Sequence, residues 1–125
     1  PVNALLSLTY TLIYHAAIRS CLTRALDSQL GFFHRPAFGR HSLACDIMEP
    51  VRPSIENWVV DLFTQGHLSL RHFSQNSHGC LLGKEGRQIY YAQVSPQLHK
   101  WQRPLDSTAH WLSMKLDSHL GAQHE

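Results

Sequence analysis

The chain has few charged residues and no long uninterrupted apolar run. Only 16% of its 125 residues are charged, and eleven Lys and Arg against nine Asp and Glu leave a net charge of +2, which gives weak support to a polyanionic partner. The most apolar stretch, residues 4–17, is interrupted by four polar side chains: Ser7, Thr9, Thr11 and His15. These features argue against a membrane-spanning segment or a membrane partner, and they predict a soluble cytoplasmic protein.

Cysteines are also scarce. The chain has three, an odd number at wide spacing with no CxxC pair: Cys21, Cys45 and Cys80. This pattern argues against a disulfide scaffold and indicates free thiols in a reducing compartment. The ten histidines offer no zinc motif either, because His67 and His72 are five residues apart and His78 with Cys80 lacks a second matched pair. Solvated or hydrogen-bonded histidines are therefore expected.

What the chain does have is apolar residues at helical spacing, enough for one core. A first helix is expected from Asn3, as its N-cap, to about Leu26. A second helix is expected to begin after Ser42 and to bend at Pro50 rather than end there. An internal proline removes one hydrogen bond and clashes with the carbonyl four residues back, which good packing can tolerate as a kink.

Two further helices are expected in the second half of the chain. They would cover residues 84–101 and 105–120, the second stopped by Gly121. Residues 65–79 are interpreted as a loop with at most one helical turn, because the strand signals there are too short to build a sheet. The predicted fold is a single all-α, bundle-like domain. Its tryptophans are expected in the core, facing inward, or in a subunit interface, rather than as base-stacking platforms: Trp58, Trp101 and Trp111.

The residues that could carry chemistry gather between residues 31 and 53. Asp46 and Glu49 are three residues apart, hence neighbours on one helix face at the edge of the core. His34, on the preceding loop, can fold back over that face. One nitrogen and two carboxylates suit Mg²⁺ or Mn²⁺ with open positions for water and phosphate oxygens. Three arginines flank this group and are candidate DNA backbone contacts: Arg35, Arg40 and Arg52.

The same residues also fit an ordinary capped amphipathic helix. In that interpretation the acids lie on its solvated face and the loop histidine only makes a hydrogen bond. Short patterns of acids and histidines match by accident often, so spacing alone favours this plainer interpretation over a metal site.

Three segments, in order, resemble a known family: residues 3–6 (Asn-Ala-Leu-Leu) with Tyr10 and Tyr14, residues 31–53, and more weakly residues 80–87. Residues 31–53 contain a Gly-Phe-hydrophobic-His element, then Gly-Arg, Ser-Leu, an Asp, Met-Glu and Arg-Pro. This pattern is similar to that of the helical domain of CRISPR-associated protein one, the integrase of spacer acquisition.

The resemblance implies a metal-dependent DNA endonuclease and integrase that joins new spacer DNA into the repeat array by transesterification. It implies that His34 and Glu49 are catalytic metal ligands and that Asp46 supports the same site. The family's further ligand, a glutamate on an early helix, has no counterpart in the chain and is expected upstream of Pro1. The chain alone is therefore expected to have little or no catalytic activity.

The resemblance also implies an organisation and partners. Residues 1–125 would be the carboxy-terminal helical, catalytic domain, without the family's amino-terminal β domain. The implied partners are double-stranded DNA, as spacer precursor and as CRISPR repeat, a second copy in a homodimer, and CRISPR-associated protein two. One departure is His72 before Phe73, a position at which the resemblance leads us to expect an acid in many relatives. Its role is interpreted as structural.

Two alternatives stay open. The chain could be a non-catalytic DNA-binding or assembly module of the same fold, possibly within a larger fusion protein. The sequence upstream discriminates, since a glutamate-bearing helix just before Pro1 would favour the enzyme. A generic helical protein with a chance motif is the other alternative, and it is disfavoured because matches this long seldom occur without the structural context behind them.

Overall fold

The computed structural model describes residues 1–23 and 43–124, with side chains described up to Lys115. The elements are α1 (Val2–Thr23), a helical segment over residues 43–48, the 3₁₀ turn η2 (Glu49–Val51), α4 (Arg52–Thr64), the 3₁₀ turn η3 (Leu70–His72), β1 (Phe73–Asn76), β2 (Gly79–Leu82) and α5 (Lys84–His124). The protein is thus mostly helical, as predicted. None of the helices in the described part of the chain is both long and apolar enough to cross a membrane.

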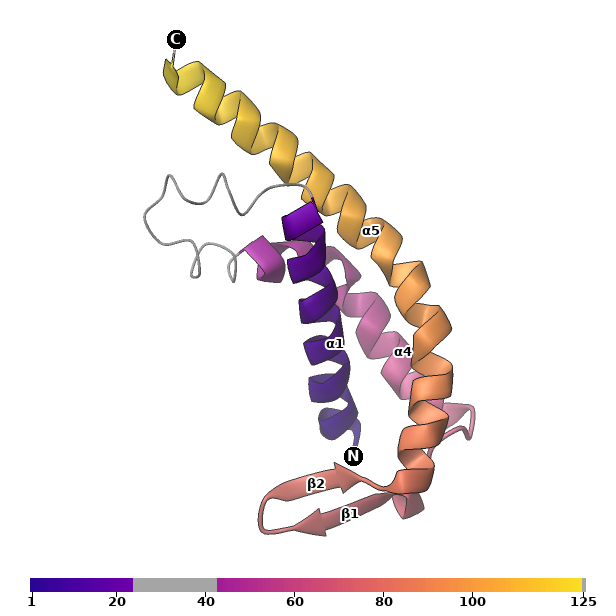
Figure 1. Ribbon diagram of the computed structural model, residues 1–125. Coiled ribbons are helices and arrows are strands. Elements are labelled where there is room, and N and C mark those ends of the chain that lie inside the picture. Colours follow the sequence, from indigo (N-terminus) through magenta and orange to yellow (C-terminus); the bar gives the residue numbers. More distant parts are fainter. Residues whose placement is uncertain (24–42, 125) are drawn as a thin grey trace.

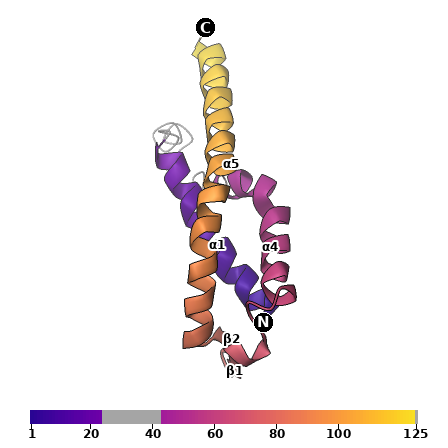
Figure 2. The same cartoon turned by 90° about the vertical axis from the view of Figure 1, so that its right-hand side faces the viewer.

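Three helices form the body of the molecule. α1 packs against both α4 and α5, and the β1–β2 hairpin lies at the end where α1 begins (Figure 1). The carboxy-terminal part of α5 extends beyond α1 and α4, as both views show (Figures 1 and 2). α5 therefore has one part inside the helical body and one part that projects from it.

α1 begins at Val2, two residues earlier than expected from an N-cap at Asn3. The Leu5 N–H donates to the Pro1 carbonyl at 3.1 Å, so Pro1 precedes the helix and Asn3 lies inside it. The prediction of Asn3 as N-cap is therefore wrong, and the predicted end near Leu26 lies outside the described residues. Proline suits this start, because a residue at the helix entrance needs no N–H for the helical ladder.

The bend at Pro50 is confirmed. Helical residues 43–48 pass into the 3₁₀ turn η2, and α4 follows without a break. Ala44, Ile47 and Val51 are buried along this segment and hold both sides of the bend against the core. Pro53 lies in the first turn of α4, where the missing N–H costs no helical hydrogen bond.

α5 is a single helix of 41 residues, so the prediction of two helices separated near residues 102–104 is wrong. Pro96 and Pro104 lie inside it, and it continues through Gly121, which was expected to stop it. Each proline costs one hydrogen bond locally. Burial of apolar side chains on both sides of the prolines offsets that loss: Tyr90, Val94, Trp101, Leu105 and Ala109.

A small antiparallel hairpin follows η3. β1 and β2 pair from Phe73 with Leu82 to Asn76 with Gly79. The Asn76 side chain accepts the His78 N–H at 2.8 Å, and Gly79 has a φ of 116° that other residues rarely adopt. The one helical turn expected in residues 65–79 is present as η3, whereas the expectation that no sheet forms there is wrong.

Aromatic side chains join α4 to α5. Trp58 makes edge-to-face contacts with Tyr90 at 5.9 Å and with Trp101 at 5.3 Å, and the Trp101 indole N–H donates to Ser54 Oγ at 3.0 Å. Tyr90 is fully buried and shares a 2.7 Å hydrogen bond with Thr9 of α1. Burial raises the pKa of Tyr90 to about 12, against the opposing effect of the Thr9 hydrogen bond. This cluster fixes how the three helices pack.

Candidate functional site

The candidate acids border an open groove between two distant segments. One wall is formed by Asp46, Glu49 and Pro50, and the other by Ser107, Thr108, Trp111 and Leu112 of α5, around a volume of about 580 Å³. Both carboxylates are exposed, while Ile47 between them is fully buried. The spacing of three residues predicted from sequence thus places both acids at one hollow, with the core behind them.

Arg52 is engaged with one of these acids. Its Nη1 lies 3.2 Å from Glu49 Oε2, and its guanidinium lies 5.3 Å from the ring centre of Tyr10. A hydrogen bond with Tyr10, and then the charge of Glu49, raise the pKa of Arg52. The pKa of Tyr10 is also raised, mainly by burial. The hydrogen bond that the Tyr10 hydroxyl donates to Glu56 Oε1 at 3.0 Å raises it further. The guanidinium predicted to contact DNA therefore also orients a candidate metal ligand.

The structure brings together Asp46, Glu49 and Arg52 from the predicted site. The other predicted residues lie outside the described residues: His34, Arg35 and Arg40. Among the described side chains, those of residues 1–23 and 43–115, no three His, Cys, Asp or Glu form a group that could hold a metal ion. The two carboxylates match the oxygen chemistry that Mg²⁺ and Mn²⁺ prefer, and so fit part of a ligand set.

The α5 wall of the groove contains a residue for which one expectation is wrong. Trp111 was expected to face inward to the core or to lie in a subunit interface; the inward placement is wrong, because 56% of its surface is exposed, and the interface placement stays a prediction. The Lys115 ammonium lies 5.4 Å from the centre of its ring. The sequence did contain a sign of this exposure. Trp111 is one of four residues spaced four apart along one helix face, and the other three are polar: Arg103, Ser107 and Lys115.

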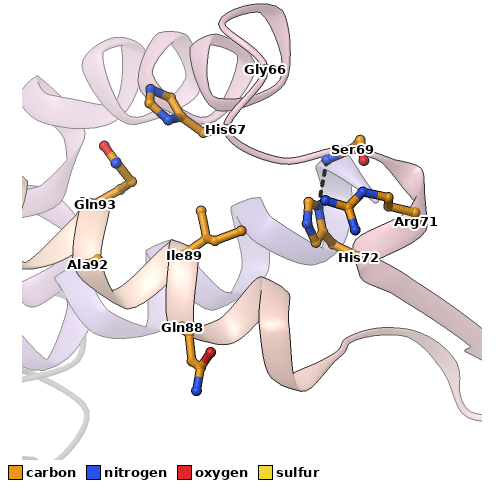
Figure 3. A pocket seen from close by; sticks show the side chains of 9 residues that line it. All are labelled: Gly66, His67, Ser69, Arg71, His72, Gln88, Ile89, Ala92 and Gln93. Atoms are coloured by element: carbon orange, nitrogen blue, oxygen red, sulfur yellow. Dashed lines mark hydrogen bonds between the residues drawn. The ribbon is translucent and has the colours of Figure 1, made fainter.

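A second hollow lies between η3 and the first turns of α5 (Figure 3). Ser69 N–H donates to His72 Nδ1 at 3.0 Å, drawn as the dashed line, and the two residues form a reciprocal cap on η3. Because Nδ1 accepts this bond, the proton of the neutral ring belongs on Nε2. Nε2 is buried, has no hydrogen-bond partner among the described residues, and lies 3.9 Å from Glu85 Oε1.

This geometry explains His72 and argues against a metal there. A protonated Nε2 cannot ligate a metal, and Figure 3 shows the His67 ring at the opposite end of the hollow from His72. A carboxylate in place of His72 would accept the same Ser69 N–H, so histidine substitutes for the acid expected at this position. The structural role inferred for His72 is confirmed.

The family model described as CRISPR associated protein Cas1 matches residues 1–95, most of the chain. The chain belongs to the Cas1 family. Both groove acids and Arg52 fall within the match, whereas the α5 wall of the groove, from Ser107 to Leu112, lies beyond it.

Several Cas1 relatives are similar to the chain. The CRISPR-associated endonuclease Cas1 1 of Thermodesulfovibrio yellowstonii is 40% identical over 103 residues, which are 81% of this chain and 31% of that protein. A Cas4 exonuclease/Cas1 endonuclease fusion of Geobacter sulfurreducens is 37% identical over 74% of this chain and 17% of the fusion. The Cas1 endonuclease of Methanocaldococcus jannaschii is 30% identical over 79% of this chain and 31% of its own length. The chain therefore spans about a third or less of these relatives.

Proposed function

We propose that residues 1–125 are the carboxy-terminal helical, catalytic part of a metal-dependent DNA endonuclease and integrase of CRISPR spacer acquisition. The observation that carries the proposal is the open groove with Asp46 and Glu49 on one wall, in a chain of the Cas1 family. Two relatives named as Cas1 endonucleases support nuclease chemistry. An exposed hollow with two carboxylates suits a polymeric substrate better than a small enclosed ligand.

In this proposal Asp46 and Glu49, with His34, hold a divalent cation, Mg²⁺ or Mn²⁺. When bound, such a cation stabilises negative charge on phosphoryl oxygens and thereby promotes attack on a phosphodiester. Arg52 Nη1 donates to Glu49 Oε2 at 3.2 Å, so Oε1 is the carboxylate oxygen that this arginine does not bind. This arrangement fixes the direction of the ligand carboxylate, as partners behind a metal ligand commonly do.

The proposal extends to substrate and partners. Double-stranded DNA, as spacer precursor and as repeat, would follow the groove, with its phosphates held by Arg35, Arg40 and Arg52. The working assembly would be a homodimer with CRISPR-associated protein two, in the cytoplasm of a prokaryote. We also propose that the isolated chain has little or no catalytic activity, because the family's further glutamate ligand has no counterpart within it.

A second candidate is a non-catalytic DNA-binding or assembly module of the same fold. It follows if the chain, in which the family's further glutamate ligand has no counterpart, holds no catalytic metal. It predicts salt-sensitive DNA binding that is indifferent to divalent metal.

The deciding experiment measures Mn²⁺-dependent cleavage and integration by the complete natural polypeptide containing this chain. His34→Ala and Glu49→Ala should each abolish activity, whereas Asp61→Ala, which removes an exposed acid of α4 outside the groove, should retain it. Circular dichroism checks that all variants fold. An inactive wild type that still binds DNA would establish the non-catalytic alternative.

A further inference from the structure

Trp111 is the most unexpected side chain of the groove. Tryptophan is largely buried in most proteins, yet 56% of this side chain is exposed. It lines the same hollow as Asp46 and Glu49, on the opposite wall. An exposed indole ring beside two candidate catalytic acids offers a flat apolar face to whatever occupies the groove.

The ring belongs to a row of exposed side chains. Arg103, Ser107, Trp111 and Lys115 follow one another at intervals of four residues on α5, and all four are exposed. Successive members are about 6 Å apart along the helix axis. Arg103 therefore precedes the ring along this row and Lys115 follows it, with the Ser107 hydroxyl between Arg103 and the ring. The Lys115 ammonium lies 5.4 Å from the ring centre.

We propose that Trp111 is a stacking platform for an unpaired nucleobase of the DNA strand that enters the groove, with Lys115 and Arg103 contacting the phosphates on either side of that base. This inference rests on the proposed function, and it adds a strand-positioning residue on the wall opposite the acids. Aromatic side chains commonly bind single strands in this way, because every base has a π face and no sequence-specific hydrogen bond is required.

Charge complementarity favours a nucleic acid strand over a protein segment. A protein segment packed across the groove would also cover the Asp46 carboxylate and the Glu49–Arg52 ion pair, and the desolvation of these charges opposes association. A stacked base covers only the ring, while its phosphates lie along the exposed face of α5 that carries Arg103 and Lys115. An unpaired base is required because the bases of a duplex already stack on their neighbours.

The test uses single-stranded oligonucleotides with 2-aminopurine at successive positions, whose fluorescence falls when the base stacks. The complete polypeptide should quench the probe at one position, and Trp111→Ala should abolish the quenching and weaken binding by about 5- to 150-fold. Trp111→Phe keeps a ring and should restore most of both signals. Tyr91→Ala is the matched control, because Tyr91 is a 47% exposed aromatic residue of α5 outside the groove.

Specific results would overturn the inference. Unchanged quenching and affinity in Trp111→Ala would show that the ring contacts no base. A fall in the sedimentation mass of the DNA-free protein on Trp111→Ala would show that a second copy covers the ring instead.

The two proposals can fail separately. Loss of cleavage in Glu49→Ala together with normal quenching in Trp111→Ala would retain the nuclease and overturn the stacking role. Trp111-dependent quenching in a wild type without cleavage would retain the stacking role and overturn the nuclease.

Discussion

Trp101 and Trp111 lie ten residues apart on the same helix and have opposite surroundings. Trp101 is 3% exposed, contacts Trp58 at 5.3 Å and donates a hydrogen bond to Ser54. Trp111 is 56% exposed and lines the groove. Ten residues rotate a helix by about 1000°, so the two side chains leave α5 about 80° apart. That angle separates the face that meets α4 from the face that meets the candidate site.

The comparison shows that α5 has two different tasks along its length. Its amino-terminal part contributes Tyr90, Val94 and Trp101 to the core, and its later part contributes Trp111 and Lys115 to an open surface. Substitutions in the two parts should therefore separate stability from binding.

The largest expected difference is in the stability of two matched variants. Trp101→Ala should lower the free energy of unfolding by about 3–5 kcal/mol, because it removes a buried ring and the hydrogen bond to Ser54. Trp111→Ala should change it by less than about 0.5 kcal/mol, as expected for an exposed residue. Urea unfolding measures the free energy of unfolding of both variants. Equal decreases would contradict the inference that Trp101 is packed in the core and Trp111 is not.

Alkaline pH should act on the packed part of α5 through Tyr90. Its pKa is raised from 10.0 to about 12 by burial, so the folded state holds this proton more tightly than the unfolded state. The stability contribution is present below pH 10 and is lost as pH rises from 10 to about 12. The loss should be about 2 kcal/mol.

Unfolding measured between pH 9 and 12 tests this expectation. Tyr90→Phe should remove the pH dependence that Tyr90 contributes, at a cost of about 1 kcal/mol at neutral pH for the lost Thr9 hydrogen bond. Tyr91→Phe, a change in the exposed neighbour, should leave the dependence in place. If stability still fell between pH 10 and 12 in Tyr90→Phe, the pH dependence would belong to another titrating group.

A smaller effect is expected at a polar contact between α1 and the middle of α5. Ser20 Oγ donates to Asp106 at 2.6 Å and accepts from Gln102 at 3.0 Å, which joins α1 to α5 between the two tryptophans. Ser20→Ala should cost about 1 kcal/mol, because Gln102 and Asp106 stay bonded to each other. Thr11→Ala, at an exposed site of α1, should cost less, and thermal unfolding compares the two. An equal cost would show that the contacts of Ser20 with Gln102 and Asp106 add nothing to the packing of α1 against α5.

Features with a local cause could be predicted from the sequence. Helical spacing predicted the helices, and the bend at Pro50 follows from the chemistry of proline. Asp46 and Glu49 reach one hollow because residues three apart share a helix face. The predicted roles of His34, Arg35 and Arg40 stay predictions.

Features that depend on distant packing could not be predicted in this way. α5 continues through Pro96 and Pro104 with α1 packed against it and with Trp58 and Ser54 of α4 in contact with it, and the local sequence carries no sign of that support. The second wall of the groove begins at Ser107, nearly half the chain away from Asp46. The hairpin strands have four residues each, too few for an alternating pattern to be recognised.

The continuity of α5 through its prolines makes the helix a lever arm. Trp111 lies 15 residues beyond Pro96, or about 22 Å along the axis. A change of about 10° in the direction of the helix axis at Pro96 would move the indole by about 4 Å, a distance comparable with the thickness of an aromatic ring. The spacing between Trp111 and the two acids is therefore sensitive to the direction that α5 takes at Pro96.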